Sequence, residues 1–114
     1  MKGKIDNLEL IKTYKLKRTD YPDLKFQGIL LGSVEGSIVS YIGKNISEYI
    51  FTLYETIADR FICHKVCTTS YDITTYTAKY TKTNAGIIDF FGQSNLAHDL
   101  YDSVDIDNSE LIQE

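Results

Sequence analysis

Apolar and polar residues alternate with a period of two along the first part of the chain. Within residues 7–18, Leu8, Leu10, Tyr14 and Leu16 recur at even positions between the charged residues Glu9, Lys15 and Lys17. This alternation predicts a strand with one buried face. Asp20-Tyr21-Pro22-Asp23 predicts a reversal, because Pro22 restricts its own backbone and that of Tyr21. Residues 26–32 predict a central strand, whose glycines at 28 and 32 favour a bulge or a close backbone approach.

The middle of the chain predicts further strands. Residues 37–42 form a candidate strand after a turn at Glu35-Gly36, with a boundary at Gly43-Lys44-Asn45. Segments 49–56 and 60–69 are rich in β-forming residues and predict a hairpin around Ile57-Ala58-Asp59, where Asp59 tolerates a left-handed backbone. Residues 74–83 alternate tyrosine and alanine with threonine and lysine, which predicts a strand with one aromatic face.

The periodicity changes near the C-terminus. Residues 87–91 predict a short apolar strand. In residues 95–104 the apolar positions follow a helical stripe, and Ser94 or Asn95 can cap this helix. A final segment, 109–113, forms a turn of helix or frays. The prediction is a single α+β domain over residues 1–114, with ends 1–5 and 106–114 frayed. Its antiparallel sheet of five to seven strands curls over one C-terminal helix.

Composition supports this fold class. The chain has 114 residues, 43% of them hydrophobic, which suits one core. Fourteen Ile, eleven Thr, nine Tyr and five Phe favour strands. A single Pro and seven Gly exclude collagen-like and low-complexity classes. No apolar run has secretory or membrane-spanning length, so we expect a cytoplasmic protein that neither spans a membrane nor carries such a signal.

Charge is distributed unevenly. Residues 1–25 hold seven Lys/Arg and four Asp/Glu, whereas residues 84–114 hold no basic and seven acidic residues. One basic patch lies on the predicted first strand and the turn after it, at Lys12, Lys15, Lys17, Arg18 and Lys25. Three interpretations stay open: contact with nucleic-acid phosphates through residues 12–25, a solvated strand whose lysines discourage aggregation, or contact with the acidic helix of the same or a neighbouring chain.

Candidate catalytic and metal-binding residues are few. Cys63 and Cys67 are the only cysteines and are expected as free thiols in a reducing compartment. On a strand they lie about 13 Å apart, and His64 points to the opposite face, so the three do not converge on one metal ion. No phosphate-binding loop, dinucleotide fingerprint or nucleophile elbow is present. We therefore predict no metal, no cofactor and no catalytic residue.

The remaining polar candidates are histidine and tyrosine. His98 lies on the predicted helix beside Asp99 and one turn before Asp102, where an acid–base role is an alternative to a solvated ion pair. Tyrosines on the strands suggest a flat face that binds a partner, because tyrosine is enriched where an apolar ring is buried and its hydroxyl meets water. The candidate binding residues are Lys12, Lys15, Lys17, Arg18, Tyr76, Tyr80, His98 and Tyr101.

A family resemblance rests on three segments in order. They are Phe26-x-Gly28-x-Leu30-Leu31-Gly32, Leu53-Tyr54-x-Thr56-x-x-x-Arg60-Phe61-x-x-His64 and Leu100-Tyr101-Asp102-x-Val104. Over residues 25–105 the chain resembles the C-terminal part of the EXLDI proteins of mobile elements and actinobacteria. It departs from them in lacking the final Glu-x-Leu-Asp-Ile, in having Asp59 where a glycine usually stands, and in lacking their N-terminal helical segment. The resemblance implies a sheet domain attached to regulators and transfers no catalytic or DNA-binding residue.

These observations favour one function. The leading prediction is a non-enzymatic binding or regulatory module of a bacterial or mobile-element system, which contacts a protein partner or forms a homodimer. One alternative is a small-ligand site or small enzyme between sheet and helix, with His98, Asp99 and Tyr101 as polar groups. The other is nucleic-acid contact through the basic first strand.

Overall fold

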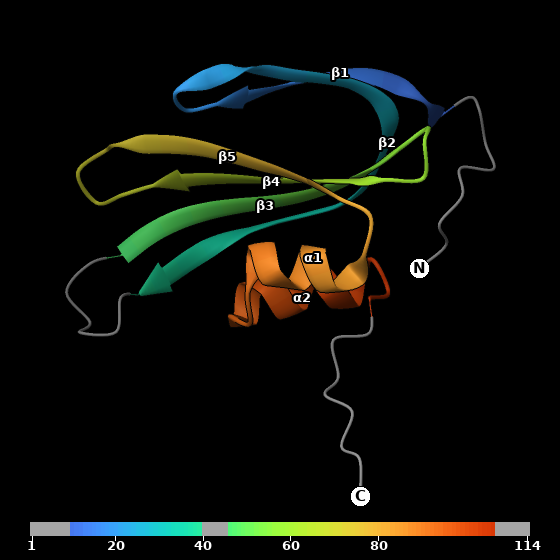
Figure 1. Ribbon diagram of the computed structural model, residues 1–114. Coiled ribbons are helices and arrows are strands. Elements are labelled where there is room, and N and C mark those ends of the chain that lie inside the picture. Colours follow the sequence, from blue (N-terminus) through green and yellow to red (C-terminus); the bar gives the residue numbers. More distant parts are fainter. Residues whose placement is uncertain (1–9, 40–45, 107–114) are drawn as a thin grey trace, which may run out of the picture.

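A curled antiparallel sheet precedes two helices in the computed structural model, which describes residues 10–39 and 46–106 (Figure 1). The elements are β1 (Lys12–Arg18), β2 (Tyr21–Val39), β3 (Ile46–Thr56), β4 (Phe61–Thr68), β5 (Thr74–Thr81), α1 (Asn84–Phe91) and α2 (Asn95–Ser103). Each strand pairs with its neighbours in sequence, in the order β1-β2-β3-β4-β5. The α+β class with a five-stranded curled sheet is confirmed, but two helices, not one, pack against it.

Strand β2 is much longer than expected. It runs for 19 residues and pairs with β1 along its first part and with β3 along its second. The turn predicted at Glu35-Gly36 is wrong, because residues 32–39 pair continuously with β3. A register shift between Leu30 and Gly32 marks the bend of this strand. At Gly28 a side chain would collide with the carbonyl oxygen of Glu55, so glycine permits the close approach of the two strands.

Aspartates sit at the three described turns between strands. Asp20, Asp59 and Asp72 have φ values of 66°, 59° and 62°, in the left-handed region that short polar side chains tolerate. The expectation for Asp59 is confirmed. The reversal predicted at 20–23 comes slightly earlier, because Tyr21 and Pro22 already belong to β2.

The helix α1 replaces the strand predicted at 87–91. The Oγ1 of Thr83 accepts a hydrogen bond from the N–H of Gly86 at 3.0 Å and caps this helix. Ile87 and Phe91, one turn apart, both lie in the core. Helix α2 is confirmed, with Ser94 as its cap through a 3.1 Å bond from the N–H of Ala97.

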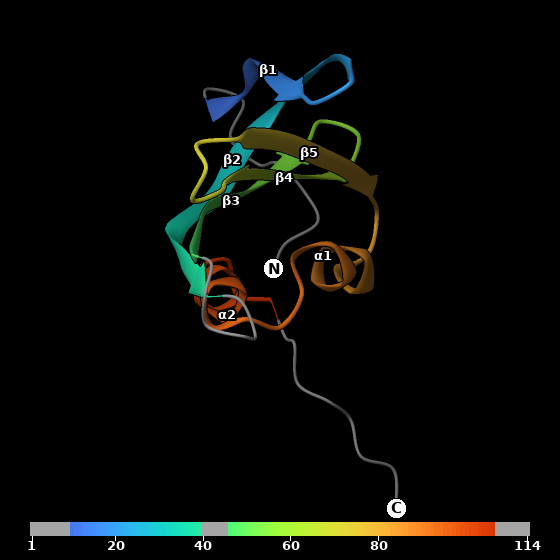
Figure 2. The same cartoon turned by 90° about the vertical axis from the view of Figure 1, so that its left-hand side faces the viewer.

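Both helices lie against one face of the sheet (Figure 2), and the main core fills the layer between them. Its buried members are Phe51, Leu53, Phe61, Cys63, Ile87, Phe91, Leu96, Ala97, Leu100, Tyr101, Val104 and Ile106. Gly32 and Gly36 let α2 pack closely on β2, since a Cβ there would lie 2.5 Å from a methyl of Val104 and 3.1 Å from one of Leu96. Ile106 therefore belongs to the core and not to a frayed end.

A smaller core forms on the opposite face, where the β1–β2 hairpin folds over β3 and β4. Leu16, Tyr54 and Ile62 are buried there, packed by Tyr14, Leu24 and Phe26. The curl closes where the N–H of Thr19 donates to the carbonyl oxygen of Tyr76 at 2.8 Å, and the N–H of Tyr76 donates to the Oγ1 of Thr19 at 2.7 Å. The sheet thus curls toward a barrel (Figure 1), and these two hydrogen bonds join the end of β1 to β5.

Several predictions fall outside the described residues. They concern residues 1–5 and 7–9, the boundary at 43–45 with the end of the strand predicted before it, and the segment 109–113. Neither helix of the described part is long and apolar enough to cross a membrane.

Candidate functional site

The inner face of the curled sheet is only half covered. The strand register arranges its side chains in rows across β2 to β5. The first row is Ser33, Thr52, His64 and Ala78; the second is Glu35, Ile50, Val66 and Tyr76; the third is Ser37, Glu48, Thr68 and Thr74. Thr52 and His64 in the first row are buried, whereas the second and third rows are largely exposed. We call these two rows the open inner face.

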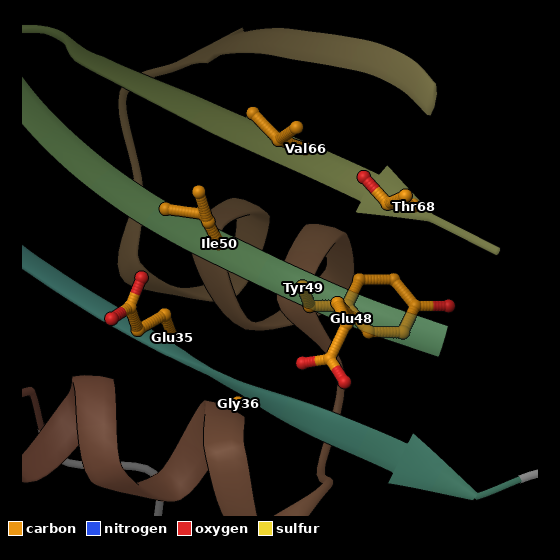
Figure 3. A pocket seen from close by; sticks show the side chains of 7 residues that line it. All are labelled: Glu35, Gly36, Glu48, Tyr49, Ile50, Val66 and Thr68. Atoms are coloured by element: carbon orange, nitrogen blue, oxygen red, sulfur yellow. The ribbon is translucent and has the colours of Figure 1, made fainter. Parts of the chain in front are cut away.

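A pocket of about 450 Å³ lies on the open inner face. Its lining residues are Glu35, Gly36, Glu48, Tyr49, Ile50, Val66 and Thr68, from three neighbouring strands (Figure 3). Ile50 and Val66 form an apolar floor between β3 and β4. Tyr49 packs against the helix-side core, in keeping with the alternation of side chains along β3. The pocket therefore joins two carboxylates and a hydroxyl to an apolar surface.

Hydrogen bonds orient part of this face. The Oγ of Ser37 donates to the Oε1 of Glu48 at 2.7 Å, which holds that carboxylate against β2. The hydroxyls of Thr68 and Thr74 lie 3.0 Å apart across β4 and β5. Glu35 makes no hydrogen bond or ion pair with another described residue, so its carboxylate is available to a ligand.

Tyr76 forms the inner end of the site, and its ring contacts the side chains of His64 and Lys17. The rings of His64 and Tyr76 stack with centroids 6.4 Å apart, and the Nζ of Lys17 lies 5.7 Å from the centre of the tyrosine ring. The Nε2 of His64 lies 2.9 Å from the carbonyl oxygen of Lys17. His64 is thus a buried structural residue that joins β4 to β1.

The structure brings some of the predicted binding residues together. Lys17, Arg18 and Tyr76 meet at the seam between β1 and β5. A hollow of about 590 Å³ lies there, lined by Arg18, Thr19, Asp20, Tyr21, Thr75, Tyr76, Thr77 and Ala78. Tyr80 lies farther along β5, beside another hollow of about 590 Å³ that Arg60 and Lys82 also line.

The other predicted binding residues lie elsewhere. Lys12 and Lys15 are exposed on β1, where Lys15 faces Lys25 across the hairpin and lies 3.9 Å from Asp23. His98 and Tyr101 belong to α2, on the far side of the sheet. Tyr101 is fully buried, and its hydroxyl donates to the carbonyl oxygen of Gly92 at 2.6 Å. Its side chain serves the helix packing and is not accessible to a ligand.

The cysteines lie on the helix side. Cys63 is fully buried, and burial raises the pKa of its thiol to about 12. Cys67 is partly buried, and its hydrogen bond with Tyr49 is the main cause of the raised pKa of that tyrosine. His64 lies on the opposite face, as the alternation predicts. Within the described ranges, no group of three His, Cys, Asp or Glu side chains is placed to hold a metal ion.

Sequence reasoning missed the lining of the pocket. The pair Glu35-Gly36 favours a turn, and Glu48, Ile50, Val66 and Thr68 belong to no sequence motif. The available signal was the period-two pattern Ser33-x-Glu35-x-Ser37 in β2, which extends the strand through the supposed turn. Register then decides which of these side chains become neighbours.

The fold and the open inner face define a class of protein: a small α+β protein with a five-stranded curled sheet backed by two helices and a partly uncovered concave surface. No family model, curated protein or solved structure matches this chain.

Proposed function

We propose that this protein is a non-enzymatic binding module that holds a basic segment of a partner protein on its open inner face. The carrying observation is the pocket over Ile50 and Val66, which is flanked by two carboxylates. Neither a lysine nor an arginine lines it. The chemistry of the pocket suits a lysine or arginine side chain, whose apolar stem packs on the floor while its cationic end meets Glu35 and Glu48.

The placement of reactive groups supports binding and not catalysis. Neither histidine nor cysteine lines the pocket. His64 is engaged with Lys17, and the thiol of Cys63 lies in the helix-side core. His98 and Asp99 lie on α2, across the sheet from the pocket. General acid–base chemistry requires such groups to converge on one substrate atom, and these groups are separated by the sheet.

The resemblance to EXLDI proteins points in the same direction. It implies a sheet domain attached to regulators, and a role in binding is consistent with such a domain. A small-ligand site between sheet and helices has less support, because that layer is filled by the main core. The pocket on the inner face lies within the usual size range of ligand sites, so a peptide side chain can enter it.

Peptide selection tests this function without a known partner. The protein is immobilised and used to select from a phage-displayed library of random dodecapeptides; the enriched peptides are then measured by fluorescence anisotropy. We expect enriched peptides to contain lysine or arginine beside apolar residues. Ile50→Ala, which removes part of the apolar floor without changing its charge, should weaken them about fivefold or more.

Two matched controls make the result specific. Ile57→Ala makes the same substitution at an exposed position in the β3–β4 turn, and it should leave the affinity within about twofold. Glu35→Lys should weaken basic peptides, whereas Asp99→Lys, the same reversal of charge on α2, should not. Failure to enrich any peptide, or equal losses in Ile50→Ala and Ile57→Ala, would overturn the proposal.

A further inference from the structure

Strand β5 forms an edge of the sheet that carries two hollows. Its backbone pairs with β4 on one side, while on the other side Tyr76 bonds to Thr19 at the end of β1. One hollow lies at this contact, between the β1–β2 turn and the first half of β5. The second lies at the end of β5, beside the start of β4. The two hollows follow one another along the same strand.

Four cations line or border this edge, and they come from three separate parts of the chain. Arg18 lines the first hollow, with Lys17 beside it above Tyr76. Arg60 and Lys82 line the second hollow. None of the four forms an ion pair with another described residue. Two carboxylates accompany them: Asp20 in the first hollow, and Asp59 next to Arg60 in sequence.

Tyrosine rings are exposed beside these cations. Tyr21 and Tyr80 are 69% and 60% exposed. The guanidinium carbon of Arg18 lies 5.5 Å from the centre of the Tyr21 ring, which holds a cation beside an accessible aromatic face. Tyr76 and Tyr80 lie on the same side of β5, about 13 Å apart along the strand. Each hollow thus combines cations with tyrosine rings. We call this set the β5 edge strip; its members are Lys17, Arg18, Tyr21, Arg60, Tyr76, Tyr80 and Lys82.

We infer that the β5 edge strip binds single-stranded nucleic acid. Arginine and lysine side chains neutralise phosphates, and exposed tyrosines provide surfaces on which unpaired bases stack. A duplex keeps its bases stacked inside, so its phosphates would contact the cations of the strip but its bases would not stack on the tyrosine rings. An acidic peptide would likewise satisfy the charges alone. The ligand that uses both kinds of side chain is a strand with free bases.

This site shares Tyr76 with the open inner face, but its cations are distinct from the carboxylates that flank the pocket there. The pocket on the open inner face is flanked by Glu35 and Glu48, which repel phosphates. The strip lies along the outer edge of the sheet, where the cations outnumber the carboxylates. An acidic chain with net charge −4 thus presents a local basic surface. Substitution of Ile50 tests the first site and leaves the second intact.

Fluorescence anisotropy with labelled 20-mers tests the inference directly. The probes are oligo(dT), oligo(U) and a mixed-sequence DNA duplex, each titrated at several salt concentrations with the full chain. We expect saturable binding of both single strands, weaker binding of the duplex, and affinity that falls as salt rises. The comparison of oligo(dT) with oligo(U) shows whether the site binds the DNA strand or the RNA strand more tightly.

Paired variants separate the strip from general charge. Lys82→Glu should weaken binding several-fold and lower the salt slope by about 0.7, as expected for one lost phosphate contact on a single strand. Lys25→Glu makes the same charge change on the hairpin and should have little effect. Tyr80→Ala should weaken binding about tenfold, whereas Tyr71→Ala, at a tyrosine that is 77% exposed in the β4–β5 turn, should not.

Three results would overturn the inference. The first is no saturable binding of either single strand at low salt. The second is tighter binding of the duplex than of the single strands. The third is an equal loss in each variant and its control, which would show attraction by overall charge alone. Circular dichroism of each variant establishes that its fold is intact, since all four substituted side chains are exposed.

Discussion

The two faces of the sheet are built from the same strands but differ in how far they are covered. On the helix side, Phe51 and Leu53 of β3 are buried in one continuous core. Ile50 belongs to the same strand but points to the inner side, where it is 39% exposed and lines a pocket. Two helices cover the first face, whereas a single hairpin covers half of the second. Alternation along one strand thus separates the residues that stabilise the fold from those that are free to bind.

The largest expected difference between the faces is in packing. Leu100 is fully buried between α2 and the sheet, so Leu100→Ala should lower the free energy of unfolding by about 2–5 kcal/mol. Ile50→Ala removes a half-exposed side chain and should cost under about 1 kcal/mol. Urea denaturation followed by circular dichroism measures both. Similar costs would show that the inner face is as tightly packed as the helix side.

The second-largest effect is expected from alkaline pH, which should lower the free energy of unfolding through groups buried on the helix side. Burial raises the pKa of the Cys63 thiol from 9.0 to about 12, and it also raises that of Tyr101 from 10.0 to about 12. The unfolded chain loses these protons first, so the stabilisation is complete below pH 9 and declines as pH rises toward 12. For Cys63 the loss reaches about 4 kcal/mol.

Denaturation measured from pH 8 to pH 11 checks this dependence. Cys63→Ala should flatten the decline, although the variant starts from a lower stability because of the lost packing. Leu53→Ala, at a fully buried side chain of the same core that does not titrate, is the control for lost packing and should keep the slope of the native protein. A slope unchanged by Cys63→Ala would contradict the assigned cause.

Smaller losses in the free energy of unfolding are expected when alanine replaces the glycines that permit close contacts of β2. Gly28→Ala drives a methyl group into the backbone of Glu55, which cannot move without breaking the β2–β3 pairing, and should cost about 1–3 kcal/mol. Gly36→Ala meets only the end of the Leu96 side chain at 3.1 Å, which can shift, and should cost less. Thermal denaturation ranks the two. A larger cost for Gly36→Ala would show that the contact between β2 and α2 is tighter than the contact between β2 and β3.

The smallest effect is expected on the outer hairpin. Lys15 and Asp23 lie 3.9 Å apart with side chains 71% and 41% exposed. Exposed pairs at such a distance contribute little, so Lys15→Ala should change the free energy of unfolding by less than about 0.5 kcal/mol. A larger loss in urea denaturation would mean that the hairpin depends on this pair to cover the smaller core.

Sequence periodicity predicted much of the fold but little of the candidate site. The hairpin of β3 and β4, strand β5 and helix α2 with its Ser94 cap all follow from local patterns. Helix α1 was missed because Ile87-Ile88 and Phe90-Phe91 fit a short buried strand as well as a helix. Glu35 was missed because a glycine beside a charged residue resembles a turn, whereas Gly36 faces α2.

The order of residues alone determined which side chains share a face, because alternation is a property of each strand by itself. Only the tertiary structure decided which face is closed. That outcome depends on the register shift of β2 between Leu30 and Gly32 and on the bond between Thr19 and Tyr76, residues 57 positions apart. Contacts of this range bring the hairpin over one half of the inner face and leave the other half open, and no local pattern encodes them.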